Sequence, residues 1–134
     1  MLAEPPAIAG DPDEPADRAW ARVLLAEAVV RQPGRQPAAQ AALGPALAYY
    51  RDAQGQGARH LEFRQRFAHA LFVAALTESG APGGAARAVT WLGEAVALLD
   101  GLPEEARELQ DSRALRTTIT LLRHRLDTAP AIPP

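Results

Sequence analysis

The chain contains an internal sequence repeat. The segment Leu43–Tyr50 reads Leu-Gly-Pro-Ala-Leu-Ala-Tyr-Tyr, and the segment Leu92–Leu99, 49 residues later, reads Leu-Gly-Glu-Ala-Val-Ala-Leu-Leu. Upstream of these segments, Ala39 matches Ala88 at the same offset. A repeat with a period of this length is typical of proteins that stack copies of one supersecondary unit. The repeat therefore limits the fold to architectures built from duplicated hairpins of secondary structure.

Apolar residues recur at helical spacing in five segments of the chain, and no segment alternates with a period of two for long enough to form a strand. We therefore predict an all-α fold with helices over residues 16–32, 37–53, 58–79, 85–99 and 103–128. The predicted core positions are Trp20, Val23, Leu24, Ala28, Val30, Ala39, Leu43, Ala46, Leu47, Tyr50, Phe63, Phe67, Ala70, Leu71, Ala74, Ala75, Ala88, Trp91, Leu92, Ala95, Leu99, Leu109, Leu115, Ile119, Leu122 and Leu126.

Two residues mark expected helix ends, and a third is expected to weaken a helix interior. Asp17 can cap the first helix, because its side chain can accept hydrogen bonds from the first turn. Gly101 is expected to close the fourth helix in a left-handed conformation. Pro45 lies inside the second helix, where a proline removes a backbone hydrogen bond and costs about 3 kcal/mol.

The domain organisation follows from composition along the chain. We expect a flexible, acidic, proline-rich tail over residues 1–15, a single all-α repeat domain over residues 16–128 and a second flexible tail over residues 129–134. The first 17 residues contain five acidic and no basic residues, unlike a secretory signal. No apolar run approaches the ~18 to 20 residues of a membrane span. These features predict a soluble, cytoplasmic protein without a membrane partner.

The charge balance argues against nucleic acid as a partner. The formal net charge is −2, whereas polyanion-binding domains usually carry a basic excess. All 14 basic residues are arginines, and neither lysine nor asparagine occurs, a bias that G/C-rich bacterial coding sequences produce. The absence of cysteine excludes thiolate metal sites and cysteine nucleophiles.

No catalytic or cofactor motif is recognisable. The histidines His60, His69 and His124 have no histidine or carboxylate at the i+4 spacing that would direct two ligands to one metal ion. The serines Ser79 and Ser112 lie outside any Gly-x-Ser-x-Gly turn. The carboxylates of Glu62, Glu78 and Glu94 are most simply solvated groups on helix surfaces. We therefore predict that the protein is not an enzyme and needs no metal or cofactor.

The repeat resembles that of the tetratricopeptide family. Trp20, Leu24 and Ala28 of the first helix correspond to Phe67, Leu71 and Ala75 of the third, so the helices are ordered A1-B1-A2-B2-A3. In the B helices, Ala39-x3-Leu43-x2-Ala46 and Ala88-x3-Leu92-x2-Ala95 resemble the family's small-x3-large-x2-small pattern, and the last helix resembles its capping helix. The departures are a unit of about 48 residues instead of 34, and leucines where the family has glycine. A compact five-helix bundle with a duplicated hairpin is the alternative fold.

Aromatic residues divide into two groups. Trp20, Phe67 and Trp91 lie in phase with apolar stripes and are expected in the core. Adjacent residues on a helix do not share a face, so one of Tyr49 and Tyr50, and one of Leu71 and Phe72, is expected at the surface.

The predicted fifth helix is strongly cationic. Arg113, Arg116, Arg123, His124 and Arg125 occur between Ser112 and Leu126 without an acidic residue. These residues form either a solvated flank that interacts favourably with the helix C-terminus or a groove for a carboxylate-bearing segment, which arginine can hold through two hydrogen bonds.

The family resemblance implies a protein–protein interaction module, of the adaptor or cargo-chaperone type, that binds a peptide or protein segment in a groove lined by the A helices. The partner-binding positions implied by this resemblance are Arg18, Leu25, Gln65, Ala68, Phe72, Arg113, Arg116, Thr120 and Arg123. Two alternatives are a helical small-molecule sensor and a structural homodimer. An acidic partner is favoured by the arginines of the fifth helix.

Overall fold

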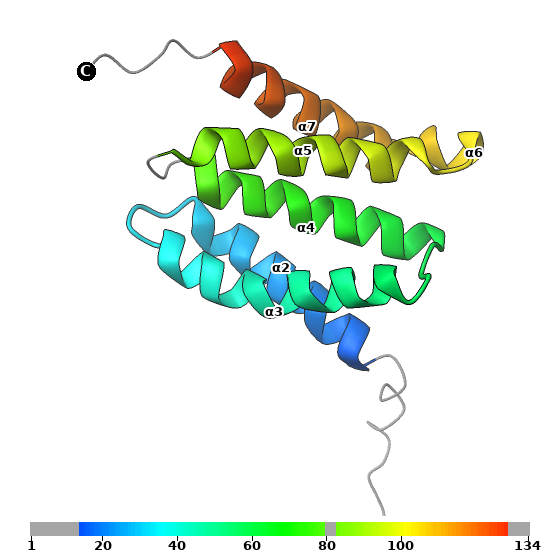
Figure 1. Cartoon of the computed structure of the whole chain (residues 1–134), viewed down its shortest axis with the longest axis horizontal. Coiled ribbons are helices and arrows are strands. Elements are labelled where there is room, and N and C mark those ends of the chain that lie inside the picture. Colours follow the sequence, from blue (N-terminus) through cyan, green and yellow to red (C-terminus); the bar gives the residue numbers. More distant parts are fainter. Residues whose placement is uncertain (1–13, 80–82, 129–134) are drawn as a thin grey trace, which may run out of the picture. The chain divides into compact units, whose positions relative to one another are not determined.

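A computed structural model describes residues 14–79 and 83–128, which form six helices and no strand (Figure 1). The helices are α2 (Glu14–Val30), α3 (Gln36–Gly55), α4 (Leu61–Ser79), α5 (Gly84–Asp100), α6 (Glu104–Arg107) and α7 (Gln110–Thr128). The prediction of an all-α fold is confirmed. Most of the two expected tails, residues 1–13 and 129–134, lies outside the described residues, and Pro15 belongs to α2 instead of a tail.

The chain divides into two compact units at Gly57. In the first unit, α2 and α3 pack side by side as an antiparallel pair. In the second unit, α4 and α5 form another antiparallel pair, α7 packs against both of them, and the short α6 contacts α7. The division falls between the two predicted hairpins, so each repeat contributes one helix pair.

The residues that define the repeat occupy equivalent positions in the two pairs. Ala39, Leu43 and Ala46 of α3 are buried, as are their counterparts Ala88, Leu92 and Ala95 of α5. Small side chains in a helix contact let the two axes approach closely, while the leucine fills the space between them. The repeated sequence segment therefore forms the packing surface of the second helix in each pair.

Glycines in the left-handed region shape two of the connections. Gly34 has a φ of 76° between α2 and α3, and Gly83 has a φ of 72° as the residue before α5. Residues with a Cβ atom rarely adopt these angles. Gly101, in contrast, has a φ of −77°, so the predicted left-handed cap at the end of α5 is wrong.

The predicted fifth helix is broken into α6 and α7. Leu102 and Ala106 are buried at α6, and a continuous helix would bring Arg113, seven residues after Ala106, onto the same buried side. Burying a guanidinium without a partner is costly. The break at Glu108 and Leu109 changes the helical phase, so Arg113 is exposed and Ser112 is buried instead.

The core of α4 agrees with the prediction, whereas that of α2 does not. All six predicted positions of α4 are buried, namely Phe63, Phe67, Ala70, Leu71, Ala74 and Ala75. In α2 the buried stripe consists of Ala19, Val23, Ala26 and Val30. Leu24 is 45% exposed and Ala28 is exposed, so their predicted burial is wrong. Because α2 is apolar on two sides, the core predicted from periodicity combined residues from both sides.

Several further side chains differ from expectation. Trp20 and Trp91 are only half-buried, and Leu109 is exposed. Asp17 lies inside α2, which begins at Glu14, and is not its cap. Pro45 lies inside α3 as expected, with its ring exposed, and the helix continues through it.

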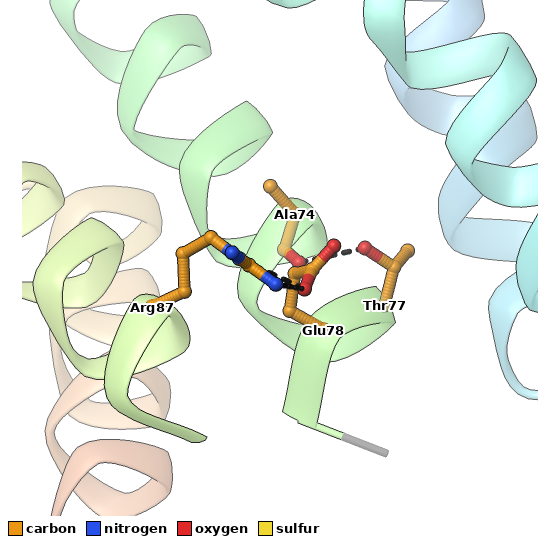
Figure 2. A network of polar contacts seen from close by, with 4 residues as sticks. All are labelled: Ala74, Thr77, Glu78 and Arg87. Atoms are coloured by element: carbon orange, nitrogen blue, oxygen red, sulfur yellow. Dashed lines mark hydrogen bonds and ion pairs between the residues drawn. The ribbon is translucent and has the colours of Figure 1, made fainter. Parts of the chain in front are cut away.

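An ion pair joins the end of α4 to the start of α5 (Figure 2). The guanidinium of Arg87 donates to Glu78 Oε1 over 3.1 Å, and the side chain of Glu78 is only 15% exposed. One residue earlier, the hydroxyl of Thr77 donates to the carbonyl oxygen of Ala74 over 2.7 Å. Glu78 is therefore a structural residue of the helix pair, and its interpretation as a solvated surface group is wrong.

Among the described residues, no helix combines the length and apolar character needed to cross a membrane.

Candidate functional site

The outward face of α7 carries the candidate site. Ile119 and Leu122 are buried on the inner side of this helix, with Leu115 and Leu126 half-buried beside them. The helical repeat of 3.6 residues therefore turns another set of positions to the solvent. We define the outward face as the exposed residues that lie within a sector of about 120° around the helix, namely Arg113, Arg116, Thr117, Thr120, Arg123 and His124. None of them is acidic.

A cleft of about 400 Å³ lies at the start of this face. It is formed by the end of α5, by α6 and by the first turns of α7. Its lining residues are Asp100, Glu104, Arg107, Glu108, Arg113, Arg116 and Thr117. Three carboxylates and three guanidiniums thus share one open depression, and their formal charges cancel.

Arg116 is held by an ion pair across the cleft. Its Nη1 atom donates to Oδ1 of Asp100, at the last residue of α5. Both side chains are about half exposed, so water screens the pair and its contribution to folding is small. The side chains of Arg113 and Arg123 are exposed on the same face. Both guanidiniums are therefore accessible to a ligand.

Gln65 positions α7 instead of facing a groove. Its Nε2 atom donates to Ser112 Oγ over 2.8 Å and joins α4 to the beginning of α7. Ser112 is buried, so this hydrogen bond satisfies a hydroxyl that water does not reach. The bond fixes the first turn of α7, where Arg113 follows directly.

The other predicted partner-binding residues are not gathered at one site. Phe72 is only 4% exposed and Ala68 is fully buried, so the expectation that they face a groove is wrong. Phe72 packs against the ring of His69, one turn earlier in α4, with a centroid distance of 6.1 Å. Arg18 and Leu25 are exposed on α2, in the other unit, and do not line the cleft. Thr120 and Arg123 are exposed on α7 beyond it.

Sequence reasoning missed the acidic side of the cleft. Asp100, Glu104 and Glu108 belong to the end of α5 and to α6, and only the helix break brings them beside the arginines of α7. Pro103 and Glu104 correctly predicted a helix start here, but no proline or glycine marks the break before Gln110.

The described residues offer no candidate metal site beside the cleft. No group of three or more histidine, aspartate or glutamate side chains within residues 14–79 and 83–128 could hold a metal ion. Neither His69 nor Glu62 is part of the cleft lining.

No family model, curated protein or solved structure matches this chain.

Proposed function

We propose that this protein is a protein–protein interaction module built from tetratricopeptide-like helix pairs, and that the outward face of α7 binds an acidic segment of a partner protein. The observation that carries this proposal is the group of exposed arginines, Arg113, Arg116 and Arg123, on one face of α7. Arginine binds carboxylates through two parallel hydrogen bonds, which favours an acidic peptide.

The spacing of the arginines favours a particular spacing of acidic residues in the proposed partner. Arg113 and Arg123 are ten residues apart, which is about 15 Å along a helix at 1.5 Å per residue. An extended peptide covers that distance in about four to five residues at ~3.3 Å each. The partner is therefore expected to present two acidic residues separated by three or four others. The carboxylates of Asp100, Glu104 and Glu108 repel a continuous polyanion, so such isolated acidic residues suit the face better.

The lining of the cleft favours a peptide over a small apolar molecule. Six of the seven lining residues are charged, whereas small-molecule sites are mostly apolar with a few polar groups. The sensor alternative therefore has less support than the interaction module. We expect neither a catalytic residue nor a cofactor at this face.

The test uses a fluorescent peptide with two glutamates separated by four serines. We expect weak, saturable binding to the full-length protein, measured by anisotropy at low salt, and a loss of about tenfold or more in affinity for R113Q/R123Q. The matched control is R125Q, which removes an exposed arginine from another side of the same helix. A peptide with glutamines in place of the glutamates should not bind.

Two results would overturn the proposal. Binding that is equal in R113Q/R123Q and the unmodified protein would place the peptide elsewhere. An equal loss in R125Q and R113Q/R123Q would show attraction to charge without a defined face. Amide shifts of α7 in an NMR titration identify the contact directly, because bound carboxylates perturb the residues between Arg113 and Arg123.

A further inference from the structure

Helix α2 has a second apolar stripe that faces solvent. Leu24 is 45% exposed, Leu25 is 54% exposed, and Ala21 and Ala28 are also exposed. These four residues have the i, i+3, i+4, i+7 spacing of one helix face. At 100° per residue, this face is turned by about 180° from the buried stripe that packs against α3. A helix apolar on two opposite sides is typical of one that is covered on both.

Opposite charges lie at the two ends of the exposed stripe. Asp17 is seven residues before Leu24 and lies on the same side of α2, while Arg31 directly follows Val30, the last residue of the helix, at the other end of the stripe. Both side chains are exposed. The stripe is therefore negative at one end and positive at the other, with an apolar centre.

We infer that this stripe binds the same stripe of a second copy of the chain, with the two α2 helices antiparallel about a two-fold axis. The axis passes between Leu24 and Leu25, so each leucine meets its own equivalent. Ala21 then faces Ala28 of the second copy, and Asp17 faces Arg31 of the second copy. Every residue of the stripe has a suitable neighbour under this one operation, as an isologous interface requires.

The size and charge of the side chains favour a second copy over an unrelated partner. The leucines lie at the crossing and the alanines to either side of it, so the small side chains let the two helices approach until the leucines are in contact. The antiparallel arrangement forms two Asp17–Arg31 pairs, whereas a parallel one would place like charges together. Asp17 also interacts within its own chain, and a carboxylate can accept several hydrogen bonds at once. The apolar patch is small, so the dimer is expected to be weak and dependent on concentration.

Charge reversal tests this arrangement by sedimentation equilibrium of the full chain over a wide concentration range. D17R and R31D should each dimerise about tenfold or more weakly than the unmodified protein, because both ion pairs become repulsive. An equimolar mixture of D17R and R31D should regain dimerisation, since both pairs are attractive in the mixed dimer. The substitution L25Q should weaken dimerisation both in the unmodified protein and in the mixture of D17R and R31D.

The matched control is R22D, which changes the charge of α2 outside the stripe and should leave the association constant unchanged. Circular dichroism establishes that each variant is folded. A monomeric unmodified protein at millimolar concentration, or a D17R and R31D mixture no tighter than the variants alone, would overturn the proposal. Peptide binding by α7 is measured separately, so the two proposals can fail independently.

Discussion

Burial, and not side-chain size, distinguishes the residues on which stability depends. Trp91 is the largest side chain of α5, yet it is half-buried, whereas its neighbour Leu92 is fully buried. The difference is one of helical phase: Leu92 lies on the stripe with Ala88 and Ala95, and Trp91 lies at its edge. Trp91 therefore contributes less to the stability of the fold than its predicted position in the core implies.

Leu92→Ala is expected to lower the free energy of unfolding by about 2 to 5 kcal/mol, because it removes buried methyl groups and leaves a cavity. Urea unfolding followed by circular dichroism measures the change. Leu121→Ala is the matched control, since Leu121 is 61% exposed in the same unit, and its effect should stay within about 0.5 kcal/mol. Similar losses for the two variants would contradict the assignment of the α5 packing face.

At the scale of helices, the shared glycine of the repeat has no packing role. Gly44 of α3 and Gly93 of α5 occupy equivalent positions after the repeated leucines, and a Cβ atom added to either would meet no atom within 4 Å beyond its chain neighbours and the backbone of its own helix. Neither has a positive φ. The close contact between helices depends on the alanines instead.

Gly93→Ala should therefore stabilise the protein by about 0.5 to 1 kcal/mol, because alanine loses less backbone entropy on entering a helix. Thermal or urea unfolding of this variant measures the change. Gly44→Ala should gain less, because Gly44 precedes Pro45, whose ring crowds a Cβ atom on the preceding helical residue. Gly34→Ala is the contrasting variant: its φ of 76° disfavours alanine, so it should destabilise. Destabilisation by Gly93→Ala would indicate a close contact at that position.

The sequence predicted the helices and the repeat better than it predicted the site. The core of α4 was predicted correctly because every residue from Phe67 to Ala75 except His69 is buried, so apolar residues of almost any helical phase lie in the core. Periodicity failed in α2, where apolar residues on opposite sides leave the phase undetermined, and at Leu109, where helical spacing continues across a break. The cationic character of α7 could be predicted from the arginines in its sequence. The pairing of Arg116 with Asp100 and of Gln65 with Ser112 could not, because both depend on how distant helices pack.

For the whole molecule, the pattern of helix contacts is mostly local in sequence. Helix α2 packs against α3, the next helix along the chain, and α4 packs against α5. Only the contacts of α7 with α4 and α5 reach further within the second unit. Each unit contains a core formed largely by neighbours in sequence.

The short sequence separation of these contacts affects the folding rate. Pairing of consecutive helices closes only short loops, so little chain entropy is lost before favourable contacts form. Proteins dominated by local helical contacts fold within microseconds to milliseconds. We therefore expect the main refolding phase of this protein, measured by stopped-flow or temperature-jump fluorescence, to be complete on the order of milliseconds or less. The antiparallel pair α2 and α3 can also form during synthesis, before the ribosome has released the residues of α7.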